Sequence, residues 1–183
     1  MKSITYFAVG LLLVVSAVVF SQQISSTPQK IGQMPADVKK HQDPTLGMSV
    51  QPKNIKGKAG KKIIVKLQVK IPKKWHLYGT ELQENKDGIG PQPTEITLKD
   101  STPLFSLGKV ESPKTHVEYD EGFEMDVKSI AGNVTFNLPI TIAADAAPGK
   151  YKSQIAIYFQ MCDGKTCLTP HEETVPFEVE IVR

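Results

Sequence analysis

The sequence lacks the signatures that mark nucleotide-binding and zinc-binding proteins. Its 183 residues contain no phosphate-binding loop, no dinucleotide-binding glycine fingerprint and no internal repeat. Only two cysteines occur, Cys162 and Cys167, so no second cysteine pair is present to complete a structural zinc site. The four-residue spacing between them is also uncommon for a zinc knuckle. These absences leave the two cysteines as the main chemical feature of the chain.

The net charge of the chain is small. Lysine and arginine number 22 against 19 aspartate and glutamate residues, which gives a formal net charge of +3. Lysines gather between Lys53 and Lys74, but they alternate with apolar residues at a period of two, as on the solvated face of a strand. Aromatic residues are not interleaved with them. We therefore expect no nucleic-acid partner.

The chain begins with the features of a secretory signal peptide. A basic start is followed by residues 4–20 without charge and by the small residue Ser21. We expect a signal peptide over residues 1–21, a flexible polar leader over 22–44 and no stable membrane insertion after cleavage. An uncleaved anchor is the alternative, because the apolar run is near the lower limit for spanning a bilayer. Export predicts a periplasmic or otherwise secreted protein, in which a disulfide is chemically permissible.

Residues 45–183 show short strand-like runs between turn residues and no helical periodicity. The clearest run, residues 63–71, places apolar side chains on one face and Lys66, Gln68 and Lys70 on the other. Similar core-facing sets occur in residues 134–142, 155–161 and 175–181. At least about seven such runs in one domain predict an all-β, immunoglobulin-like antiparallel β-sandwich. A barrel is the alternative architecture.

The two cysteines flank a turn signal, Asp163-Gly164, between apolar alternating segments. Opposed residues in such a pair have Cβ atoms about 4.5–5.5 Å apart, and a disulfide needs roughly 3.5–4.5 Å, so a modest adjustment would join the cysteines. A ring of about six residues adds only ~2 kcal/mol of stability in the chain-entropy model. A small exposed ring is also open to attack by an external thiolate. On the residues alone, a redox pair and a structural staple are equally supported.

The alternation of the preceding strand predicts how the two cysteines differ. Cys162 falls on the face of Tyr158 and Gln160, opposite the core set, so in a regular strand it is not a core thiol. Cys167 follows the turn and precedes Pro170, which limits further strand pairing there. We therefore expect Cys167 to be the more accessible sulfur.

Three segments resemble the N-terminal periplasmic domain of DsbD, the thiol:disulfide interchange protein. They are Ile71-Pro-Lys-Lys-Trp-His-Leu-Tyr78, Tyr119-Asp-Glu-Gly-Phe123, and Tyr158-Phe-Gln-Met-Cys162 followed by Cys167-Leu-Thr-Pro170. In order and spacing they cover roughly residues 47–183. The resemblance implies an immunoglobulin-like sandwich whose cysteine pair cycles between disulfide and dithiol without a cofactor. It also implies exported thioredoxin-like partners, such as disulfide isomerases and cytochrome c maturation thioredoxins.

The resemblance further implies roles for individual residues. Cys167 matches the cysteine that forms the mixed disulfide with a partner, and Cys162 matches the one that resolves it. In the family a cap loop shields the pair and opens when a partner docks. The matching residues are Asp120, Glu121 and Phe123 in the cap, with Phe123 as its lid, and His76, Tyr78 and Tyr158 around the cysteines. At the position of His76 the family more often has tyrosine.

The sequence ends at Arg183, without the membrane-spanning electron conduit and the terminal thioredoxin-like domain of full-length DsbD. We therefore expect a stand-alone monomer that exchanges electrons with a membrane donor supplied in trans.

Two other functions remain open on the residues. A non-catalytic sandwich module with a structural bridge fits the same strand pattern. A copper-handling protein is the second, because Met161, Cys162, Cys167 and His171 are soft or borderline ligands close together in the sequence. We assign no metal ligand to the site.

Overall fold

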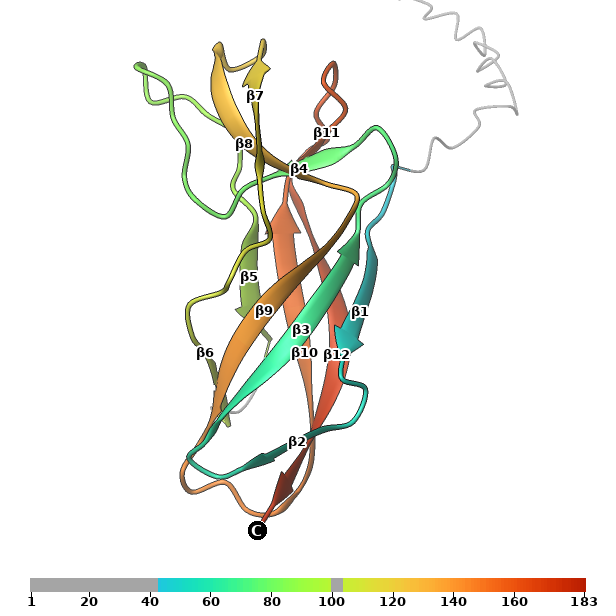
Figure 1. Ribbon diagram of the computed structural model, residues 1–183, viewed down its shortest axis with the longest axis vertical. Helices are drawn as coiled ribbons and strands as arrows, with labels where there is room; N and C mark the ends of the chain where they lie inside the picture. The colour runs from blue at the N-terminus through green and yellow to red at the C-terminus, as the bar shows by residue number, and fades with distance from the viewer. Residues whose placement is uncertain (1–42, 100–103) are drawn as a thin grey trace, which may run out of the picture. The chain divides into compact units, whose positions relative to one another are not determined.

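The computed structural model describes residues 43–99 and 104–183 of the chain (Figure 1). The predicted signal peptide lies outside these residues, as does the predicted leader except for its last two positions. The described residues form strands joined by turns and loops, without an α-helix. Consequently none of the described segments is a helix that could cross a membrane.

Twelve strands make up this part of the chain. They are β1 (Gly47–Gln51), β2 (Ile55–Lys58), β3 (Lys62–Lys70), β4 (His76–Tyr78), β5 (Glu95–Leu98), β6 (Phe105–Leu107), β7 (His116–Asp120), β8 (Met125–Ala131), β9 (Asn133–Ile142), β10 (Gly149–Phe159), β11 (Met161–Cys162) and β12 (His171–Val182).

Two four-stranded sheets form a sandwich. Sheet A has the order β1-β3-β9-β6, and sheet B has the order β2-β12-β10-β5. All neighbours are antiparallel except β2 and β12, which run parallel. Figure 1 shows β3 and β9 lying across β10 and β12. The all-β, immunoglobulin-like sandwich predicted from the alternating pattern is confirmed.

The core lies between sheets A and B, and it confirms the predicted alternation. Along β3, Val65 and Leu67 are fully buried while Lys66 and Lys70 are exposed. Each fully buried aliphatic side chain contributes about 1.5–3 kcal/mol relative to exposure. The largest fully buried core side chains are Leu67, Leu77, Ile130, Phe136, Leu138, Ile140, Ile142, Ile155, Ile157, Phe159 and Met161.

A third sheet, sheet C, has the order β11-β4-β8-β7. Its strands extend those of the sandwich: β3 leads into β4, β10 leads into β11, and β8 runs into β9 through Gly132. The backbone at Gly132 has a positive φ of 76°, which glycine adopts without steric cost and which lets the chain change direction between sheets. Figure 1 shows sheet C at the end of the domain opposite the C-terminus. One face of sheet C packs against the main core, and the opposite face lies outside that core.

The expectation for Cys162 is half confirmed by this change of sheet. Strand β10 ends at Phe159, Gln160 breaks the pairing, and β11 starts at Met161. Met161 packs in the main core, so the adjacent Cys162 faces away from that core, as predicted. Cys162 is nevertheless only 1% exposed, because a second cluster with Tyr78 and Val127 buries it. The strand is not regular, and its outer face is covered.

Candidate functional site

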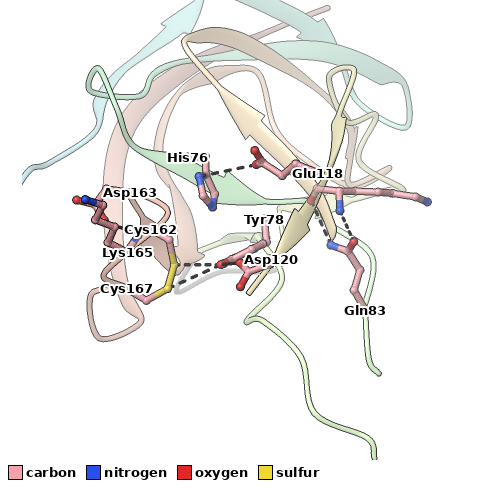
Figure 2. A network of polar contacts seen from close by, with 10 residues as sticks. His76, Tyr78, Gln83, Glu118, Asp120, Cys162, Asp163, Lys165 and Cys167 are labelled. Carbon is pink, nitrogen blue, oxygen red and sulfur yellow. Dashed lines mark hydrogen bonds and ion pairs between the residues drawn. A yellow bond between two sulfur atoms is a disulfide. The ribbon is translucent and has the colours of Figure 1, made fainter. Parts of the chain in front are cut away.

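The outward face of sheet C gathers side chains from four strands. Cys162 pairs with His76, which pairs with Ala131 on its other side. Tyr78 pairs with Ser129, which pairs with His116. Directly opposed residues in a sheet point to the same face, so these side chains and the alternate residues of β7, Glu118 and Asp120, share one surface. Figure 2 shows the resulting cluster around the two sulfur atoms.

Cys162 and Cys167 form a disulfide whose Cα atoms lie 4.1 Å apart. The predicted antiparallel arrangement is present: the two residues form a β-bridge, and the amide of Leu168 donates to the carbonyl of Met161 at 2.9 Å. The two sulfurs differ sharply in accessibility, because Cys162 is buried and Cys167 is exposed. The prediction that Cys167 is the more accessible cysteine is confirmed for this disulfide form.

The turn between the cysteines is built locally. The carboxylate of Asp163 accepts hydrogen bonds from the amides of Lys165 at 3.0 Å and Thr166 at 2.8 Å. These backbone hydrogen bonds stabilise the charged carboxylate and lower the pKa of Asp163. Gly164 occupies the position with a positive φ of 83°. The turn therefore helps to position Cys167, together with the hydrogen bond from the Leu168 amide to the Met161 carbonyl.

Tyr78 lies at the centre of the site. Its side chain is fully buried, and its hydroxyl donates to the Asp120 carboxylate, with an oxygen-to-oxygen distance of 2.8 Å. The same oxygen lies 3.2 Å from the sulfur of Cys162 and 3.8 Å from that of Cys167. Burial raises the pKa of Tyr78 far above its usual range, and the hydrogen bond to Asp120 and the nearby negative charges raise it further. The hydroxyl therefore stays protonated and acts as a donor.

The raised pKa of Tyr78 predicts an alkaline loss of stability. The folded state favours the neutral hydroxyl, so this stabilisation is complete below the unfolded tyrosine pKa of about 10 and is lost as pH rises through the higher folded pKa. We expect the free energy of unfolding to fall above about pH 10 more steeply in the unaltered protein than in Tyr78→Phe. Denaturant titrations of both proteins between about pH 8 and pH 11 measure this difference, and parallel pH profiles would contradict it.

The predicted cap loop is the turn between β7 and β8. Asp120 stabilises it, because its second carboxylate oxygen accepts from the amides of Gly122 at 2.8 Å and Phe123 at 3.2 Å. The Phe123 ring packs edge-on against Tyr78, with ring centroids 5.9 Å apart. Phe123 therefore covers the Tyr78–Cys162 cluster and leaves Cys167 exposed. Glu121 is exposed at the turn, and no hydrogen bond or ion pair joins it to another described residue.

His76 lies beside the cysteines, as the sequence predicts. Its ring meets the Tyr78 ring edge-on at 5.2 Å, and its side chain is only 14% exposed. Nδ1 lies 3.9 Å from the carboxylate of Glu118. The other ring nitrogen, Nε2, is buried and has no hydrogen-bond partner among the described residues.

The structure does not bring Tyr158 to the cysteines. This residue lies in sheet B, where its cross-strand neighbours are Glu95 and Glu172. Its side chain points away from the face that carries the core residues Ile157 and Phe159. The family resemblance implied a place for Tyr158 around the cysteines, but the chain changes sheets at Gln160 and leaves Tyr158 in sheet B.

The loop after β4 supplies supporting residues that the sequence did not identify. The Gln83 side chain continues the hydrogen bonding between β4 and β8. Its Nε2 donates to the carbonyl of Lys128 at 3.2 Å, and its Oε1 accepts from the Lys128 amide. Asn85 donates to the carbonyl of Phe123 at 3.0 Å and so ties the cap to this loop. Glu118 was also missed, although it precedes Asp120 by two residues and therefore shares its face. The alternation within β7 is the signal that identifies it.

No metal-binding cluster involves the cysteines within the part of the chain that the structure describes. Residues 43–99 and 104–183 contain no group of three or more His, Cys, Asp or Glu side chains that could hold a metal ion. His171, a ligand in the copper hypothesis, packs against Phe159 with ring centroids 4.6 Å apart, and its Nε2 lies 3.5 Å from Glu173. A groove of about 890 Å³ lies beside sheet C, and neither cysteine lines it. Exchange between protein thiols needs an exposed sulfur, which Cys167 provides.

Comparisons with known proteins identify the family. The family described as "Thiol:disulfide interchange protein DsbD, N-terminal" matches residues 48–179. No curated protein matches the sequence. The chain is similar to the reduced N-terminal domain of DsbD from Neisseria meningitidis, with 15% identity and a TM-score of 0.45, over 67% of this chain and 82% of that chain.

Two other solved structures show weaker likenesses. A family 123 glycoside hydrolase from Clostridium perfringens has 10% identity and a TM-score of 0.42, over 75% of this chain and 27% of that chain. BcpA, the major pilin subunit of Bacillus cereus, has 12% identity and a TM-score of 0.34, over 76% and 40%. The family match is of a different kind, since it spans both cysteines and all four strands of sheet C. This chain belongs to the family of DsbD N-terminal domains.

Proposed function

We propose that this protein is an exported, monomeric thiol–disulfide exchange protein. It passes pairs of electrons between a membrane donor and thioredoxin-like partners through Cys162 and Cys167. The observation that carries the proposal is the asymmetry of the disulfide, with one sulfur exposed at a local turn and the other buried under Tyr78 and Phe123. Exchange needs one sulfur that an external thiolate can reach and a second that reacts only within the molecule.

Reduction of the pair begins at Cys167. A donor thiolate attacks its sulfur, the Cys162–Cys167 bond breaks, and the bonding electron pair leaves with Cys162. The second thiol of the donor, as its thiolate, then attacks the donor sulfur of the mixed disulfide. Cys167 leaves as a thiolate, so the donor is oxidised and this protein holds two more electrons.

Delivery to an acceptor runs through the same species in reverse. The Cys167 thiolate attacks the acceptor disulfide and forms a mixed disulfide with it. Cys162, as its thiolate, then attacks the sulfur of Cys167, which restores the internal disulfide and releases the acceptor as a dithiol. The short distance between the cysteine Cα atoms, 4.1 Å, favours this ring closure over attack by a further external thiol.

The family supports thioredoxin-like proteins as partners, and the sequence of residues 1–21 supports export. Both the donor in the membrane and the exported acceptors are part of the proposal. Cytochrome c maturation thioredoxins and disulfide isomerases are the acceptor classes that the family resemblance suggests.

Reduction by a thioredoxin-like protein tests this function. A catalytic amount of a thioredoxin, kept reduced by its reductase, should reduce the Cys162–Cys167 disulfide within minutes, because Cys167 is exposed. Quenching with an alkylating reagent and mass spectrometry counts the free thiols. The control is the same incubation with reductase alone. A disulfide that survives prolonged incubation, yet opens once the protein is denatured, would favour a structural bridge.

A further inference from the structure

Reduction leaves a proton unaccounted for at Cys162. The departing sulfur is buried, and burying an unpaired charge is costly. The Tyr78 hydroxyl is the nearest donor, at 3.2 Å, but it has a single proton and already donates to the Asp120 carboxylate at 2.8 Å. A carboxylate and a thiolate would then compete for that one hydrogen bond. A second proton source is therefore needed beside Cys162.

His76 is placed to provide it. It is the direct cross-strand neighbour of Cys162, and such neighbours have Cβ atoms about 4.5–5.5 Å apart. Its Nε2 is buried without a partner among the described residues, although this nitrogen is always either a donor or an acceptor. Figure 2 shows the imidazole on the same side of the sheet as Tyr78 and the disulfide, with the Glu118 carboxylate beside it.

The other charged and titratable groups around His76 do not replace it. Strand β8 offers none, because its residues opposite β4 are Ser129, Ile130 and Ala131. The turn between the cysteines carries Asp163 and Lys165, both exposed. From β4, β7 and the cysteine segment, the groups that share the face of His76 are Tyr78, His116, Glu118, Asp120, Cys162 and Cys167. Of these, Glu118 forms the ion-pair contact with the ring, at 3.9 Å from Nδ1.

We propose that His76 donates a proton to Cys162 during reduction and accepts it during oxidation, with Glu118 stabilising the imidazolium. This inference rests on the proposed exchange function. When a donor thiolate attacks Cys167, the electron pair of the broken bond stays on Cys162, and Nε2 protonates that sulfur. The products are a Cys162 thiol, a mixed disulfide at Cys167 and a neutral imidazole. In the oxidative direction, Nε2 removes the thiol proton as Cys162 attacks Cys167.

The proposed roles follow the logic of an activated nucleophile, in which a base reaches the reacting group and a third group orients the base. Nδ1 lies beside Glu118, and Nε2 is the ring nitrogen without a partner among the described residues. In this disulfide form Nε2 makes no hydrogen bond to either sulfur, so proton transfer requires the ring to turn toward Cys162 as the disulfide opens. The ring exchanges its proton with water through the 14% of its side chain that is exposed.

The pH dependence of reduction by dithiothreitol tests the role of His76. The ionisation of dithiothreitol is the same for every variant, so the ratio of rates between the unaltered protein and His76→Gln isolates the imidazole. We expect this ratio to be largest, at least about tenfold, at acid pH and to approach one at alkaline pH, because only a protonated imidazole can donate a proton. Glu118→Gln should also slow reduction relative to the unaltered protein in the same pH range, by a smaller factor than His76→Gln.

His171→Gln is the matched control, since His171 also lies beside a glutamate, at 3.5 Å, but outside sheet C. Its pH profile should follow that of the unaltered protein. His76→Tyr keeps an aromatic ring in place and should lose the acid-side rate enhancement even if His76→Gln folds poorly. A ratio that is constant across pH, or profiles that coincide, would overturn the role of His76 while leaving exchange intact. A disulfide that resists reduction in the unaltered protein would overturn the exchange function as well.

Discussion

A Cys162→Ser variant is expected to capture a thioredoxin-like protein as a stable mixed disulfide. Cys167 remains exposed at the turn and can form the intermolecular bond, while the thiol that would release the partner is absent. We expect most of the variant to become linked when it meets an oxidised thioredoxin-like protein. Non-reducing electrophoresis detects the covalent complex, and reduction with dithiothreitol should dissolve it.

The Cys167→Ser variant is the matched control for this trap. Its remaining thiol, Cys162, is only 1% exposed, so an external disulfide has little access to it. We expect at most a small fraction of linked protein under the same conditions. The opposite pattern would reverse the roles of the two cysteines. Absence of trapping in both variants would favour a structural bridge.

Phe123→Ala is expected to expose Cys162 selectively. The Phe123 ring packs on the Tyr78–Cys162 cluster but leaves Cys167 open to solvent. With Cys167→Ser in the background, alkylation of Cys162 by iodoacetamide should accelerate by about tenfold, which corresponds to about 1.4 kcal/mol in the local opening equilibrium. Rates follow from mass spectrometry of quenched samples.

The same substitution combined with Cys162→Ser provides the internal control, because alkylation of the exposed Cys167 should change little. Thermal unfolding of each variant separates shielding from stability. An unchanged rate at Cys162 together with a large drop in melting temperature would place Phe123 in the supporting core instead of the cap.

The sandwich was predictable because its strands are long enough for burial to impose a period of two. In β3 and β9 each inward position is apolar, so the pattern alone identifies these two strands of sheet A. Sheet C was not predictable in the same way. Strands β4 and β11 have only 3 and 2 residues, too few for a periodic signal, and their pairing joins segments far apart in the chain.

The candidate site also combines features that the local sequence predicts with features that depend on the pairing of distant segments. The disulfide and the greater exposure of Cys167 follow from the local turn, and the sequence predicts both. The burial of Cys162 depends on Tyr78 and Phe123, which reach it only through the pairing of sheet C. The family resemblance placed Tyr158 around the cysteines, and the change of sheet at Gln160 removes it from the site.

The reduction potential of the Cys162–Cys167 pair tests the exchange function most directly. It is measured by equilibrating the protein with a redox buffer of known potential and counting alkylated thiols by mass spectrometry. A pair that exchanges electrons with thioredoxin-like partners should have a potential above about −300 mV, within reach of those partners. A value clearly below about −300 mV would identify a structural disulfide and contradict the proposed function.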